Sequence, residues 1–154
     1  MDAVMISLRP EWCEKAEDGS KPVEVRKSKP KLPTPFKVYI YCTIGPHFWR
    51  VRKPNDAFYP KGWPCPGNGS VIGEFTCDWI KPYMMTPGAL RHLSRISCVP
   101  VAELVEYGRG RNILHGWHIS DLVIYSKPRL LPDFGLTRPP QSWCYVETTE
   151  AVSA

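Results

Sequence analysis

A chain of 154 residues with 43% hydrophobic and 23% charged residues is long enough for one globular domain with a proper core. Seventeen prolines and six tryptophans favour a compact β-rich body and argue against a helical bundle. The sequence has no apolar run of transmembrane length and no signal peptide, which predicts a cytoplasmic protein with no membrane role.

The net charge of +5 is unevenly distributed, with the positive charge in residues 21–61. This segment holds ten basic residues against Glu24 and Asp56, whereas residues 1–20 are acidic and the remainder is neutral. Such a segment favours an anionic partner, either nucleic acid or a phosphate-bearing ligand. A solvated positive face is the alternative explanation.

The first two predicted elements are a strand and a short helix. Residues 3–8 are almost continuously apolar, which predicts a central strand. Pro10 suits the first position of a helix, and Gly19 suits its end. The helix would bury a narrow apolar stripe that includes Trp12.

The next predicted strand carries a compact polar cluster. Val23 and Val25 alternate with Glu24 and Arg26, so the valines should lie on one sheet face and the charges on the other. Lys21 is expected at the mouth of this strand, outside the core. A solvated strand face and a polar binding site both fit this pattern.

A basic connector and a long loop surround the third predicted strand. Residues 28–37 contain three prolines and predict a stiff connection. Residues 38–42 are rich in β-branched and aromatic residues, as strands favour. Residues 44–69 lack periodicity and contain five prolines and four glycines, which predicts a long loop inserted in the domain.

The 44–69 loop combines aromatic rings with cations. Its aromatic and basic residues are Phe48, Trp49, Arg50, Arg52, Lys53, Phe58, Tyr59, Lys61 and Trp63. Aromatic platforms beside cations hold unpaired bases in many proteins, so we expect this loop beside the ligand site. A flap whose rings pack on the sheet is the alternative.

The second half of the chain predicts two helices between two strands. Residues 71–79 alternate as a strand, and residues 87–96 and 101–107 have helical patterns. Residues 117–125 predict another strand, whose apolar phase slips near Asp121 and indicates a bulge or bend.

A basic, glycine-rich turn precedes the strand predicted at residues 117–125. Arg109 and Arg111 alternate with Gly108 and Gly110, which offers guanidinium groups and backbone donors to a phosphate. A solvated turn has the same composition.

The final predicted strand, at residues 143–147, completes the sheet, and residues 148–154 form a frayed tail. Six strands with short connections and inserted helices fit an α+β fold, a small mixed β-barrel. We therefore expect a single domain over residues 1–147.

The cysteines and histidines show no metal-binding pattern. Cys42, Cys77 and Cys144 lie within apolar strands, as buried thiols do in a reducing compartment. His115 and His118 lack an acidic or cysteine partner nearby, so we expect no metal site.

The pattern Gly-x-Lys-x-x-Glu-x-Arg at residues 19–26 resembles the GxKxxExR signature of the ASCH domain, a branch of the PUA-like superfamily. All four fixed positions match. The runs Trp-His-Ile-Ser-Asp at 117–121 and Pro-Pro-Gln-Ser-Trp-Cys-Tyr-Val at 139–146 also resemble small bacterial and phage members. The resemblance implies the PUA-like mixed barrel.

The resemblance also implies a binding function, because ASCH domains are similar to RNA-binding PUA domains with a cleft beside the motif strand. Lys21 and Arg26 would contact a phosphate or a base edge, and Glu24 would accept a hydrogen bond from a base or orient Lys21. The other expected ligand contacts are Trp49, Arg50, Arg52, Arg109, Arg111, Trp117 and Ser120. The expected partner is RNA or single-stranded nucleic acid, or a small nucleoside or nucleotide, without a cofactor.

A hydrolase is the alternative function, since some ASCH-like proteins are amidohydrolases acting on acetylated cytidine and others are described as ribonucleases. Lys21 matches the lysine of the amidohydrolases, but Glu24 stands where they have a threonine. A carboxylate beside a lysine acts as a base when its pKa is suitably perturbed. Lys21 and Glu24 are therefore the candidate catalytic pair. A protein-interaction module is a third possibility.

Overall fold

The computed structural model describes residues 1–44 and 69–149, so the expectations for most of the 44–69 loop and the end of the tail lie outside the described residues. All six predicted strands are present. They are β1 (Ala3–Leu8), β2 (Val23–Arg26), β3 (Phe36–Cys42), β4 (Ser70–Met84), β5 (Ile113–Arg129) and β6 (Trp143–Val146).

The strands form one mixed sheet in the order β2-β5-β4-β3-β1-β6. β1 is parallel to β3, and all other neighbours are antiparallel. The α+β class is confirmed, but a closed barrel is not formed by the described strands, since β2 and β6 end the sheet without pairing. The Arg26 side chain bridges these two ends instead, because it donates hydrogen bonds from β2 to Ser7 of β1 and to Ser142 before β6.

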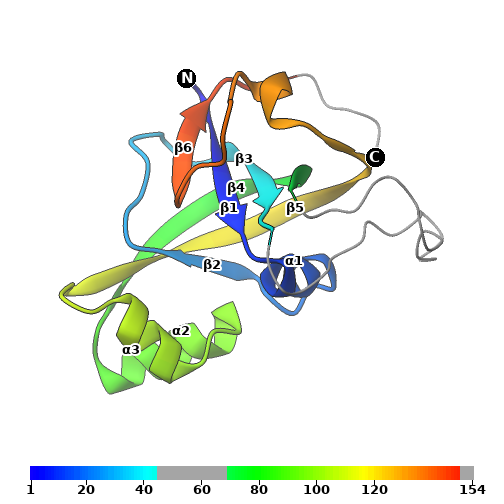
Figure 1. Cartoon of the computed structure of the whole chain (residues 1–154). Helices are drawn as coiled ribbons and strands as arrows, with labels where there is room; N and C mark the ends of the chain where they lie inside the picture. The colour runs from blue at the N-terminus through cyan, green and yellow to red at the C-terminus, as the bar shows by residue number, and fades with distance from the viewer. Residues whose placement is uncertain (45–68, 150–154) are drawn as a thin grey trace.

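β4 and β5 form a long two-stranded ribbon that crosses the molecule (Figure 1). Both strands extend beyond their predicted ends, and they pair from Met84 with Ile113 to Val71 with Arg129. Asp121 has a φ of 49°, and the pairing register shifts beside it. The predicted bulge near Asp121 is therefore confirmed.

The predicted helices are also present, as α1 (Pro10–Glu17), α2 (Pro87–Ser97) and α3 (Val101–Tyr107). α1 begins at Pro10, and Gly19 follows its end with a φ of 81°, a left-handed conformation that glycine adopts without strain. α2 and α3 lie together beside β2 and the adjoining end of β5 (Figure 1).

Strand β2 lies between two differently packed regions. Val23 and Val25 pack in a cluster with residues of α2 and α3, including Leu93 and Leu104. Glu24 pairs with Trp117 of β5, and Trp117 belongs to the main core. Paired residues of antiparallel strands share a face, so the charged side of β2 is turned toward the interior.

Candidate functional site

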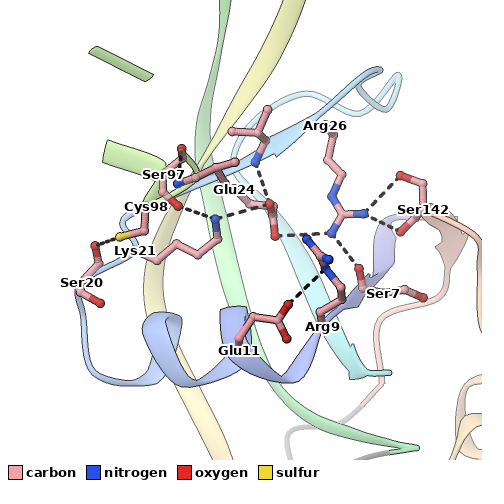
Figure 2. Close-up of polar contacts among 12 residues, drawn as sticks. Ser7, Arg9, Glu11, Ser20, Lys21, Glu24, Arg26, Ser97, Cys98 and Ser142 are labelled. Carbon is pink, nitrogen blue, oxygen red and sulfur yellow. Dashed lines mark hydrogen bonds and ion pairs between the residues drawn. The ribbon is translucent and has the colours of Figure 1, made fainter. Parts of the chain in front are cut away.

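Lys21 is buried, which corrects the expectation that it stands outside the core at the mouth of a strand. Its side chain has no exposed surface, and Nζ donates to the carbonyl oxygen of Ser97 at 2.7 Å. Nζ also lies 3.7 Å from Oε1 of Glu24 and 5.0 Å from the centre of the Trp12 ring. Helix α1 and the end of α2 close over the lysine, as Figure 2 shows for Ser97.

Glu24 occupies the middle of the polar cluster and is 5% exposed. Its Oε1 accepts a hydrogen bond from the Val25 backbone N–H at 2.8 Å. Burial alone would raise the pKa of this carboxyl group, but Lys21, Arg26 and the Val25 N–H hold its pKa below the ordinary value of 4.5. Glu24 is therefore ionised at neutral pH and acts as a hydrogen-bond acceptor.

Arg26 forms the other end of the cluster. Nη2 donates to the Ser7 carbonyl oxygen at 2.7 Å and lies 3.4 Å from Oε2 of Glu24. Nη1 donates to the carbonyl and hydroxyl oxygens of Ser142, each at 3.2 Å (Figure 2). The Arg26 guanidinium therefore connects β2 to β1 and to the residue directly before β6. Its Nε is buried and has no hydrogen-bond partner among the described residues.

A cavity of about 520 Å³ opens beside Glu24 and Arg26. Its walls also include Trp12 of α1, Tyr107 of α3 and Leu8 of β1. The volume lies in the range of about 300–1,000 Å³ that is typical of small-molecule sites. Lys21 does not line this cavity, so the motif divides into a sealed lysine and a carboxylate–guanidinium pair that faces the cavity.

The charges of the cavity wall are mixed and do not favour an anion. The wall carries the carboxylates of Glu24, Glu103 and Glu106 and the guanidinium groups of Arg9 and Arg26. The two aromatic residues in the wall, in contrast, are suited to a flat, largely apolar ligand. The cavity thus combines aromatic surface with an ionised hydrogen-bond acceptor.

The predicted Gly-Arg turn lies close to this cavity. Arg111 Nη1 donates to the Lys27 carbonyl oxygen at 3.1 Å, which connects the turn to the residue after β2. Arg109 forms an ion pair with Glu106 at 2.7 Å. Since Glu106 and Tyr107 line the cavity, the structure brings these arginines to its edge.

Two other predicted contacts lie away from the cavity. Trp117 is fully buried and packs edge-on against Phe36 and Trp143, so it is a core residue and does not line the cavity. Ser120 Oγ lies 3.1 Å from Nδ1 of His118, and Oδ1 of Asp78 lies 2.6 Å from the same nitrogen. A Ser-His-Asp relay uses both ring nitrogens, so this group is not such a triad.

The remaining predicted contacts, Trp49, Arg50 and Arg52, lie outside the described residues. Trp12 and Tyr107 were not predicted as site residues. Trp12 belongs to the apolar stripe of α1, a pattern that indicates packing, and the sequence carries no signal that would place Tyr107 beside it.

Among residues 1–44 and 69–149, no three His, Cys, Asp or Glu side chains are arranged to hold a metal ion. The five described cysteines are free thiols. No helix in the described part of the chain is both long and apolar enough to cross a membrane.

No protein-family model and no curated protein matches this sequence. The structure is nevertheless similar to the crystal structure of an ASCH protein from Zymomonas mobilis, with a TM-score of 0.69 and 20% sequence identity over 95% of this chain and 88% of that chain. A variant of that protein with a serine replaced by alanine gives a TM-score of 0.69, at 19% identity over 95% of this chain and 89% of the other. A tyrosine-to-phenylalanine variant gives 0.68, at 20% identity over 96% and 91% of the two chains. The resemblance seen in the sequence is thus confirmed at the level of structure, and this chain has the ASCH-domain fold.

Proposed function

We propose that this protein binds an unpaired nucleobase, carried by RNA or by a nucleotide, in the cavity beside Glu24 and Arg26. The observation that carries the proposal is the combination of aromatic walls with a buried, ionised carboxylate. Trp12 and Tyr107 supply the walls, and Glu24 supplies the carboxylate. Unpaired bases are recognised by these two kinds of contact, stacking and hydrogen bonds to the base edge.

Glu24 has hydrogen-bonding capacity left for a base. A carboxylate has about four lone-pair sites. Hydrogen bonds from the Val25 backbone N–H and the Arg26 guanidinium take up two of them, while Lys21 Nζ lies 3.7 Å from Oε1 as an ion-pair partner. A remaining site fits an amino or imino N–H at a base edge, and the two cations hold the carboxylate in its acceptor state.

Lys21 has a supporting role in this proposal. It is sealed from the cavity, so its function is to keep Glu24 ionised and in place. This replaces the phosphate contact that the sequence resemblance implied for Lys21.

The hydrolase alternative has less support. An efficient general base has a pKa near the working pH, whereas the pKa of Glu24 is lowered by its two cationic neighbours. Lys21 would need to reach a substrate as a reacting group, and it does not line the cavity.

The test is equilibrium binding of short single-stranded RNA and nucleotides to Trp12→Leu and Tyr107→Leu variants. Each change keeps an apolar side chain but removes the ring. Base stacking is worth about 1–3 kcal/mol, so affinity should fall by that amount in each variant.

Trp79→Leu is the matched control, because Trp79 stacks on His118 and does not line the cavity. Circular dichroism should show that all three variants are folded. Equal binding by wild type and both cavity variants would contradict the proposal, as would equal losses in the Trp79→Leu control.

A further inference from the structure

Two exposed cations lie together beside the cavity at its Tyr107 side. Lys27 directly follows Arg26, and its Nζ lies 4.7 Å from the centre of the Tyr107 ring. The Lys27 carbonyl oxygen accepts the hydrogen bond from Arg111 at 3.1 Å. Both Arg26 and Tyr107 line the cavity, so Lys27 and Arg111 mark its edge.

Lys27 and Arg111 differ from the other charges around the cavity in their partners. Arg109 is ion-paired with Glu106, and Arg9 with Glu11. Among residues 1–44 and 69–149, no ion pair links Lys27 or Arg111 to an acidic side chain. Their charge is therefore available to an anionic group at the edge of the cavity.

We propose that Lys27 and Arg111 bind the phosphate attached to the base in the cavity. This inference rests on the proposed function and specifies its ligand as a nucleotide unit, in preference to a free nucleoside. The cavity wall carries charges of both signs and suits the base, whereas Lys27 and Arg111 at its edge are cations that suit the phosphate.

The experiment compares four ligands by calorimetry: a nucleoside, its 5′-monophosphate, its 3′-monophosphate, and a single-stranded oligoribonucleotide of the same base. The phosphate should improve affinity by about tenfold over the nucleoside, as a charge-assisted contact does. In a Lys27→Gln/Arg111→Gln double variant this gain should disappear, and nucleoside affinity should stay unchanged.

Lys127→Gln/Arg138→Gln is the charge-matched control, because it also removes two positive charges and both residues are exposed beyond the stretch of β5 that pairs with β2. It should keep the full phosphate gain. For the oligoribonucleotide, removing two phosphate contacts should reduce the slope of log affinity against log salt by about 1.4, with roughly 0.7 per contact. A gain with the monophosphates identifies a mononucleotide ligand, and a gain only with the oligoribonucleotide identifies an RNA strand.

The outcomes separate the inference from the proposed function. If nucleoside and phosphorylated ligands bind equally well, the phosphate site is wrong and the base site stands. If the phosphate gain persists in the Lys27→Gln/Arg111→Gln variant, or is lost equally in the Lys127→Gln/Arg138→Gln control, the assignment to these residues is wrong. If none of the ligands binds, the proposed function fails and the phosphate site fails with it.

Discussion

Two glutamates in this fold have nearly the same surroundings but different access to ligands. Glu24 and Glu74 are 5% and 6% exposed, and each is held by a lysine. The second donor is Arg26 for Glu24 and the Tyr125 hydroxyl, at 2.8 Å, for Glu74. Of these two glutamates, only Glu24 lines the cavity.

The difference lies in what covers each carboxylate. Lys37, the partner of Glu74, keeps a third of its side chain exposed, so this pair reaches water through the lysine. Lys21 is fully covered, and the open side of the Glu24 cluster is the cavity. A buried carboxylate with a lysine partner is therefore no sign of a binding site by itself. The adjoining cavity with aromatic walls distinguishes Glu24.

Stability should separate the two glutamates most strongly. Glu24→Ala leaves Lys21 and Arg26 buried without their carboxylate, and breaking such a buried pair costs about 3–5 kcal/mol. Glu74→Ala leaves the partly exposed Lys37 and the neutral Tyr125 hydroxyl without their acceptor, which should lower the free energy of unfolding by about 1–3 kcal/mol. Urea unfolding followed by circular dichroism measures both values. Equal losses would mean that the two clusters are energetically alike.

The two lysine partners should also differ in their contribution to stability, with Lys21 contributing more than Lys37. Lys21→Ala should destabilise the protein by roughly 3 kcal/mol, the lower end of the range for a broken buried pair, since Glu24 keeps Arg26. Lys37→Ala should cost less than Lys21→Ala, because a third of the Lys37 side chain is exposed and Glu74 keeps the Tyr125 hydroxyl as a donor. If Lys21→Ala leaves the unfolding midpoint unchanged, the lysine is not part of the core as described.

Acid should weaken the Glu24 cluster. The folded-state pKa of Glu24 lies below its ordinary value of 4.5, so the stabilisation is complete above pH 4.5 and is lost as the pH falls toward the folded-state pKa. Glu24→Gln should therefore show a smaller dependence of unfolding free energy on pH below 4.5 than wild type. Glu14→Gln, at an exposed position, should retain the wild-type dependence. A wild-type slope in Glu24→Gln would contradict the lowered pKa.

Local patterns predicted the elements of this fold well. Alternation placed the valines of β2 on one face of the sheet, the face that packs against α2 and α3, and Pro10 and Gly19 marked the limits of the first helix. The phase slip at Asp121 corresponds to a real irregularity of the β4–β5 ribbon. These features depend on neighbouring residues, which a sequence displays directly.

The candidate site depended on contacts that local patterns do not contain. Lys21 is buried because Ser97, 76 residues away, accepts its hydrogen bond. Arg26 is fixed by Ser142, 116 residues away. Trp12 and Tyr107 meet at one cavity from two different helices. The motif resemblance identified the cluster, but only the tertiary structure shows that the lysine is sealed and that the glutamate faces the cavity.

The most direct test of this account is to compare ligand binding by Glu24→Gln and Glu74→Gln, two isosteric changes at similarly buried carboxylates. Affinity for a nucleotide or single-stranded RNA should be measured by calorimetry under conditions in which both variants are folded. We expect Glu24→Gln to lose about tenfold or more, because it removes a charged acceptor at the base edge, and Glu74→Gln to bind like wild type. Unchanged binding by Glu24→Gln, or an equal loss in both variants, would contradict the assignment of Glu24 as the base-recognising residue.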